Sequence, residues 1–142
     1  MAEGSIEKTL NVGFDQLWDA IVKYEDYPQF VGGVKSVDVK RPAAGKAHVT
    51  YKINVIKDIE YTIELTEDKE AGKVSWHLIS SELFKSNKGG WELKKKSDDV
   101  TDVRYWVDLE FKISVPGFML KPLVKSNLPS MIAEFEKRAK RG

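Results

Sequence analysis

Aromatic side chains with polar tips recur at alternate positions along the middle of the chain. Tyr51, Tyr61 and Tyr105 carry hydroxyls, and Trp76 and Trp91 carry indole N–H groups, in segments whose other alternate residues are aliphatic. Such side chains need a hydrogen-bond partner when they are buried. The partner can be protein, or it can be a bound molecule, because ligand pockets combine apolar walls with a few fixed polar groups. The pattern favours recognition of a hydrophobic ligand.

Groups suited to acid–base or metal chemistry are sparse. The chain has two histidines, His48 and His77, and no cysteine. Both histidines fall on the polar side of their strands, with no nearby carboxylate partner and without the spacing of metal ligands. The charged residues of the same strands also take polar positions. We therefore expect no catalytic residue, no metal site and no cofactor.

The charge of the chain is balanced as a whole but uneven along its length. A net charge of +1 argues against DNA binding. Residues 118–142 contain six Lys or Arg against two Glu, a local +4, so residues 1–117 sum to −3. Cations in a last helical turn complement the helix dipole. They would also suit RNA or transient contact with an anionic membrane, and the residues in question are Lys137, Arg138, Lys140 and Arg141.

Alternating apolar residues predict an antiparallel sheet. Turn signals at 42–45, 67–72 and 97–99 separate consecutive strands, and segment 81–88 is interpreted as a polar loop. One face of such a sheet is expected to be polar, with Asp108 and Trp106 on it. The strands are predicted at 5–11, 34–40, 46–57, 58–67, 73–80, 89–97 and 101–113.

Helical periodicity marks the two ends of the chain. One amphipathic helix is predicted at 14–22, a short second helix around Phe30 and Val31, and a long terminal helix from residue 118. Pro129 lies inside this last pattern and predicts a kink near Lys125 and Ser126. We expect an α+β protein with one domain over residues 1–142. The terminal apolar stripe consists of Leu120, Leu123, Val124, Leu128, Met131, Ile132 and Phe135.

Two stretches of the sequence resemble a known superfamily. The first is Phe14-x-x-x-Trp18-x-x-Ile21, which leads to Tyr24-x-x-Tyr27-Pro28-x-Phe30. The second runs from Gly90-Trp91-Glu92-Leu93 through Thr101-x-Val103-x-Tyr105-x-Val107 to Pro116-Gly117 and the last helix. Both stretches resemble the START-like superfamily of polyketide cyclase/dehydratases and coenzyme Q-binding proteins. The resemblance implies the helix-grip fold, a seven-stranded sheet wrapped around a C-terminal helix with an apolar cavity between them.

The expected function is non-catalytic binding or transport of a hydrophobic small molecule, which would be a lipid, a quinone or a polyketide-like compound. The superfamily also contains enzymes, so a polyketide aromatase/cyclase is the first alternative. The second is a ribosome- or protein-interacting module, with Trp106 and the basic end as its surface. The residues expected to line the cavity are Phe30, Tyr51, Ile53, Tyr61, Ile63, Trp76, Leu78, Trp91, Tyr105, Val107, Leu109, Leu123, Val124, Leu128, Met131 and Ile132.

The N-terminal residues contain no basic segment followed by an apolar run, and no window approaches 18 consecutive apolar residues. We therefore expect a soluble, cytoplasmic protein. Ligand identity and oligomeric state have no signature in the sequence.

Overall fold

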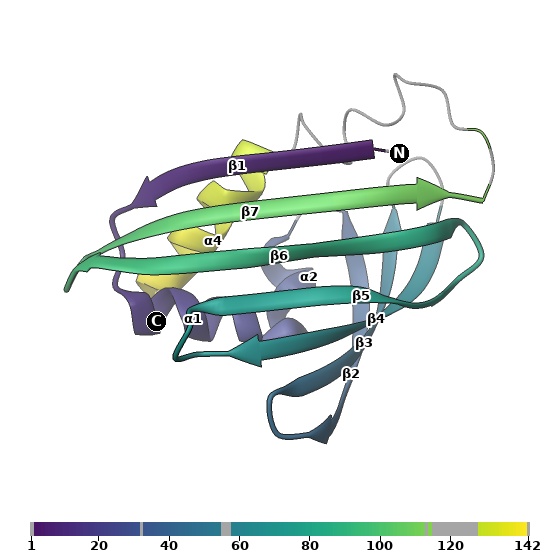
Figure 1. Ribbon diagram of the computed structural model, residues 1–142, viewed down its shortest axis with the longest axis horizontal. Coiled ribbons are helices and arrows are strands. Elements are labelled where there is room, and N and C mark those ends of the chain that lie inside the picture. Colours follow the sequence, from purple (N-terminus) through teal and green to yellow (C-terminus); the bar gives the residue numbers. More distant parts are fainter. Residues whose placement is uncertain (1, 32, 55–57, 113, 115–127, 142) are drawn as a thin grey trace.

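A curved antiparallel sheet forms the body of the molecule (Figure 1). The computed structural model describes residues 2–31, 33–54, 58–112, 114 and 128–141. Within these residues, seven strands follow the order β1-β7-β6-β5-β4-β3-β2. Their bounds are β1 (Ala2–Leu10), β2 (Val34–Ala43), β3 (Lys46–Asn54), β4 (Asp58–Asp68), β5 (Lys73–Ser81), β6 (Phe84–Ser97) and β7 (Val100–Phe111).

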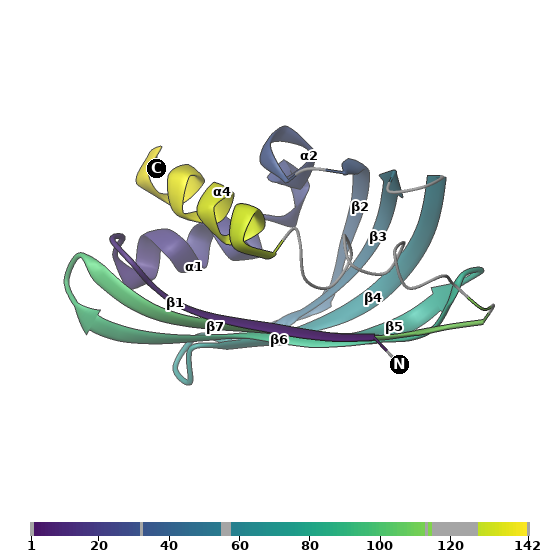
Figure 2. The ribbon, with the colours of Figure 1, turned by 90° about the horizontal axis from the view of Figure 1, so that it is seen from above.

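The helices lie in the hollow of the sheet (Figure 2). Helix α1 (Phe14–Val22) packs against α4 (Leu128–Arg141), and a 3-10 turn, η1 (Tyr24–Asp26), leads into the short helix α2 (Tyr27–Phe30). The predicted α+β helix-grip architecture is thereby confirmed. Among the described residues, no helix combines the length and the apolar character needed to cross a membrane.

The first strand lies at one edge of the sheet and pairs with the last strand. Strand β1 pairs with β7 in continuous register, with Ile6 opposite Tyr105. Strands β3 and β4 show the expected alternation, because Val49 and Ile63 are buried while Lys52 and Glu60 are exposed. A period of two therefore places one set of side chains in the hollow and the other on the outer face.

Segment 81–88 is not wholly a loop, and this prediction was wrong. Strand β6 begins at Phe84, which pairs with Phe111, and the register shifts between Phe84 and Ser86. A bulge of this kind inserts one residue and reverses the alternation. Phe84 and Asn87 therefore both lie inside although their sequence positions have opposite parity, with only 2% and 6% of their surfaces exposed.

A glycine pair in β6 lets two tryptophans pack against one strand from opposite sides. A Cβ at Gly89 would overlap the Trp76 ring on the concave face, whereas a Cβ at Gly90 would lie 2.8 Å from Nε1 of Trp106 on the outer face. The outward orientation expected for Trp106 follows from this packing. Gly89 and Gly90 are therefore required for close approach, which a side chain would prevent.

The terminal helix buries one stripe of residues against the rest of the fold. Leu128, Ile132, Phe135 and Ala139 of α4 are buried. Pro129 is the second residue of the described span of α4, Leu128–Arg141. The remaining predictions for this region lie outside the described residues, and they concern Leu120, Leu123, Val124 and the kink near Lys125 and Ser126.

Candidate functional site

Neighbouring strands place aromatic rings side by side on the concave face. Tyr51 on β3 is directly opposite Tyr61 on β4, and their rings stack with centroids 5.3 Å apart. Tyr105 on β7 is opposite Trp91 on β6, with centroids 4.9 Å apart, and it also contacts Trp76 at 5.7 Å. Offset and edge-on contacts at these distances are favourable, and they form two aromatic clusters on the floor of the hollow.

Helices α2 and α4 cover this floor. The Phe135 ring of α4 meets Trp91 at 4.9 Å, Tyr27 at 5.3 Å and Phe30 at 5.0 Å, all edge-on. The Arg138 guanidinium lies over the Phe30 ring, 5.5 Å from its centroid. Arg138 also donates hydrogen bonds to Asp26 and Gln29. These contacts connect α4 to the turn before α2 and fix the cover over the sheet.

Between the floor and the helices lies a partly open cavity of about 170 Å³. It is walled by four tyrosines, two tryptophans, two phenylalanines, aliphatic side chains and one amide. Tyr61, Tyr105 and Trp76 are only half-buried because one side of each faces this space. The lining residues are Tyr27, Val31, Val34, Tyr51, Ile53, Tyr61, Ile63, Leu65, Trp76, Phe84, Asn87, Trp91, Tyr105, Val107, Leu109, Met131 and Phe135.

The polar groups of the cavity are neutral donors. The described residues of the wall include no Asp, Glu, His, Lys or Arg. Burial raises the pKa of the Tyr51, Tyr61 and Tyr105 hydroxyls above the ordinary value, so all three stay protonated at neutral pH. None of the three donates a hydrogen bond to a described residue, whereas the Tyr27 hydroxyl donates to the Ile21 carbonyl.

The structure brings most of the predicted lining residues together. Ten of them line the cavity, namely Tyr51, Ile53, Tyr61, Ile63, Trp76, Trp91, Tyr105, Val107, Leu109 and Met131.

Four predicted lining residues lie elsewhere in the structure. Phe30 packs behind Phe135 and borders a separate hollow beside Arg138. Ile132 is fully buried between α4 and its neighbours, and Leu78 is half-buried on β5 outside the cavity wall. Leu128 starts α4 near β1. Ile132 meets neighbouring elements instead of empty space, whereas Phe30 and Leu128 border other hollows. Leu123 and Val124 lie outside the described residues.

Sequence reasoning missed seven residues of the wall. Leu65 and Phe135 belonged to patterns already recognised as apolar, and Tyr27 belonged to the aromatic cluster before Pro28. The bulge at the start of β6 concealed Phe84 and Asn87. The continuation of the odd-numbered alternation from Leu93 through Trp91 back to Asn87 could have revealed the last of these. The other two are Val31 and Val34.

The histidines have a carboxylate neighbour after all. On the outer face, Nε2 of His48 lies 2.8 Å from Oε2 of Glu64, and Glu64 is directly opposite His77 on β5. The hydrogen bond from His48, together with Lys46, lowers the pKa of the Glu64 carboxyl. Even so, no group of three His, Cys, Asp or Glu among the described residues is arranged to hold a metal ion.

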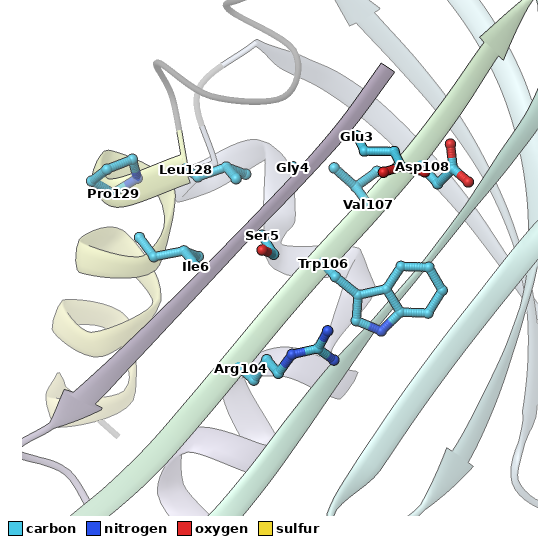
Figure 3. Close-up of a pocket in the computed structure, with 10 residues that line it drawn as sticks. All are labelled: Glu3, Gly4, Ser5, Ile6, Arg104, Trp106, Val107, Asp108, Leu128 and Pro129. Carbon is cyan, nitrogen blue, oxygen red and sulfur yellow. The ribbon is translucent and has the colours of Figure 1, made fainter. Parts of the chain in front are cut away.

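A second, larger hollow of about 680 Å³ lies beside β1 (Figure 3). Trp106 and Arg104 border it, but Arg104 is already paired with Glu92 at 2.6 Å. Asp108, expected on the polar face, is only 8% exposed, and its Oδ2 lies 3.9 Å from Lys88. The aromatic rings and free donors converge instead in the inner cavity, which we take as the candidate ligand site.

The curved seven-stranded sheet, the helix that it grips and the cavity between them define the START-like class of proteins. The chain belongs to the family described as polyketide cyclase/dehydrase and lipid transport, whose model matches residues 10–136. None of the curated proteins matches the chain significantly in sequence.

Solved structures share the fold at low sequence identity. The Zhui aromatase/cyclase from a Streptomyces species is 13% identical with a TM-score of 0.86, covering 98% of this chain and 93% of that one. A START superfamily protein from Mycobacterium smegmatis is 16% identical with a TM-score of 0.84, and 99% of each chain is covered. A protein from Thermus thermophilus is 17% identical with a TM-score of 0.83, over 98% of this chain and 97% of that one.

Proposed function

We propose that the protein binds or carries a hydrophobic small molecule in the internal cavity without transforming it. The observation that carries the proposal is an aromatic wall whose described residues contain neutral donors and no acid, base or cation. Apolar burial alone supplies the driving force, at about 25 cal/mol for each Å² removed from water. The neutral donors would orient the ligand, as in other small-molecule sites.

The proposal can be tested by ligand titration. Trp76 and Trp91 lie in the cavity wall, so a bound ring system should change their emission in a saturable way. Binding to the folded state alone must also raise the melting temperature. If a panel of quinones, fatty acids and aromatic ketones leaves both emission and melting temperature unchanged at saturating concentrations, the proposal fails.

Tryptophan variants separate binding in the cavity from binding elsewhere. Trp91→Phe should lose most of the ligand-dependent emission change. Trp106→Phe is the matched control, because Trp106 packs on Gly90 on the outer face and should not report on the cavity. If Trp106→Phe rather than Trp91→Phe abolished the ligand-dependent emission change, the ligand would bind at the outer surface.

An aromatase/cyclase-type enzyme is the alternative that the family and the fold of Zhui support. The hydroxyls of Tyr51, Tyr61 and Tyr105 would then have to supply the proton transfers. Their raised pKa values make them weak acids that hydrogen-bond more readily than they ionise. Mass spectrometry of a polyketide ligand recovered after incubation decides between the two, because a carrier returns it unchanged.

A further inference from the structure

One amide projects into the otherwise aromatic cavity. Asn87 is 6% exposed and lines the wall. The indole Nε1–H of Trp76 donates to its Oδ1 at 3.2 Å. Because an indole nitrogen can only donate, this contact determines which end of the amide is the oxygen. The NH₂ group must therefore be the other end, and no described residue accepts a hydrogen bond from it.

The strands hold this pair in place. Pairing between β5 and β6 runs from Lys73–Glu92 to Trp76–Gly89. Beyond that point β6 continues in register with β7, where Asn87 is opposite Leu109. The Trp76–Asn87 hydrogen bond thus joins two strands where their backbone pairing ends. Gly89 leaves the space that the Trp76 ring occupies, so the amide and the indole are positioned together.

Among its described residues, the cavity therefore offers hydrogen-bond donors and no positive charge. The Asn87 amide and the hydroxyls of Tyr51, Tyr61 and Tyr105 can all donate to a ligand oxygen. A ligand carbonyl oxygen would accept hydrogen bonds from these donors, and a neutral carbonyl group loses little hydration when it enters the cavity. A carboxylate would lose far more hydration on entering an apolar cavity with no cation in its described wall. The site should therefore select neutral acceptors over anions.

The size of the cavity limits the ligand further. Its volume of about 170 Å³ is close to that of engineered cavities of about 150 Å³ that bind benzene. Pockets for drug-sized molecules are larger, at about 300 to 1,000 Å³. One ring, or two fused rings, is therefore what this cavity can enclose.

We infer that the ligand is a small uncharged ring compound with a carbonyl oxygen, and that the Asn87 amide is the group that selects it. The inference rests on the proposed binding function and names the ligand class for the same cavity. It makes Asn87 a specificity-determining residue and excludes free fatty acids as preferred ligands.

Three probes of one skeleton test the inference: acetophenone, ethylbenzene and benzoate at neutral pH. Calorimetry should show acetophenone binding about fivefold more tightly than ethylbenzene, the difference expected for one net hydrogen bond. Benzoate should bind at least tenfold more weakly than acetophenone. Asn87→Leu should reduce the preference for the ketone over the hydrocarbon, although the tyrosine hydroxyls remain, while the same change at an exposed asparagine, Asn54→Leu, should preserve it in full.

The infrared carbonyl stretch of bound acetophenone gives a second measurement on the unmodified protein, in case Asn87→Leu does not fold. It should move to lower frequency than in an alkane solvent. Equal affinities for ketone and hydrocarbon, together with an alkane-like stretch, would overturn the inference and leave the binding function standing. Preferred binding of benzoate would also overturn it. If no member of a broad panel binds, the proposed function itself fails.

Discussion

At the scale of single residues, all five tyrosines are held in the protonated state. Burial raises the pKa of Tyr24, Tyr27, Tyr51, Tyr61 and Tyr105, and the hydrogen bond to Glu67 adds to the effect at Tyr24. Their contribution to stability is complete below the unfolded pKa of about 10 and is lost as the pH rises above it. Alkali should therefore weaken the fold through these residues.

Alkaline titration checks this directly. At pH 10 the native protein should show almost no tyrosinate absorbance, whereas the protein in denaturant should be about half ionised. Above that pH, tyrosinate should appear together with the loss of near-ultraviolet circular dichroism. A tyrosine that ionises reversibly near pH 10 while the fold persists would contradict the burial described here.

Val107→Trp distinguishes an empty cavity from a filled core. Val107 lines the cavity, so an added indole has space there and stability should change by less than about 1 kcal/mol. Ligand affinity should fall at least tenfold because the indole occupies the site. Val103 lies on the same face of β7, is 4% exposed and does not line the cavity, so it supplies the matched control.

Val103→Trp should cost about 1–3 kcal/mol in the free energy of unfolding, as overpacking of a core does. Urea denaturation of both variants makes the comparison. Equal destabilisation of the two, with ligand affinity of folded Val107→Trp unchanged, would place Val107 in the core and move the ligand site elsewhere.

At the scale of elements, strand β6 depends on Gly89 and Gly90 in different ways. Gly89→Ala should cost about 1–3 kcal/mol and reduce ligand affinity, because the new methyl overlaps the Trp76 ring and the backbone oxygen of Trp106. Gly90→Ala should cost less and keep ligand affinity, since the nearest atoms belong to the Trp106 side chain and the Val74 carbonyl oxygen and lie at 2.8 Å or more. Urea midpoints and calorimetry provide the measurements; the reverse order of effects would refute the packing described for β6.

The same strand shows where sequence reasoning reaches its limit. Alternation identified the inner face of β4 correctly, because Ile59, Ile63 and Leu65 alternate with polar or charged residues without interruption. The bulge near Phe84 broke that alternation, and asparagine is more typical of turns than of buried strands. Asn87 keeps the odd-numbered alternation of Trp91 and Leu93, whereas Phe84, which precedes the register shift, could be placed only once the strands were paired.

The terminal helix illustrates a different limit. Its periodicity placed Ile132 and Met131 on the inner stripe, and both are there. Only Met131 of the two reaches the cavity. Hydrophobic periodicity reports which way a residue faces, but a cavity is a property of how several elements fail to fill a space. The residues that line the cavity could therefore be identified only from the structure.

At the scale of the whole molecule, the basic end is less free than its sequence suggests. Arg138 hydrogen-bonds to Asp26 and Gln29, whereas Lys140 stays exposed although it lies 3.9 Å from Glu136. Contact with an anionic membrane would therefore depend mainly on exposed Lys137, Lys140 and Arg141. At about 1 kcal/mol for each basic residue, replacing these three by Gln should weaken binding to anionic vesicles about a hundredfold.

A vesicle sedimentation assay at low salt measures this effect, with ligand affinity as the check that the fold is intact. Replacing the exposed lysines Lys40, Lys52 and Lys85 by Gln removes the same charge from the sheet and should have little effect. Equal losses of vesicle binding in both triple variants would mean that the interaction depends on the net charge of the protein and not on the terminal helix. Unchanged vesicle binding after replacement of Lys137, Lys140 and Arg141 would mean that these cations do not contact the membrane and only complement the helix dipole.

The pairing of β1 with β7 also has a consequence for the order in which the protein can assemble. Ala2 is opposite Leu109, and α4 follows all seven strands in the chain. During synthesis all seven strands therefore emerge before the helix that covers the aromatic hollow. Contacts this distant in sequence form slowly, and an uncovered apolar surface promotes aggregation in the meantime. A small ring compound that fills the hollow at that stage would act first as a folding partner and only later as cargo.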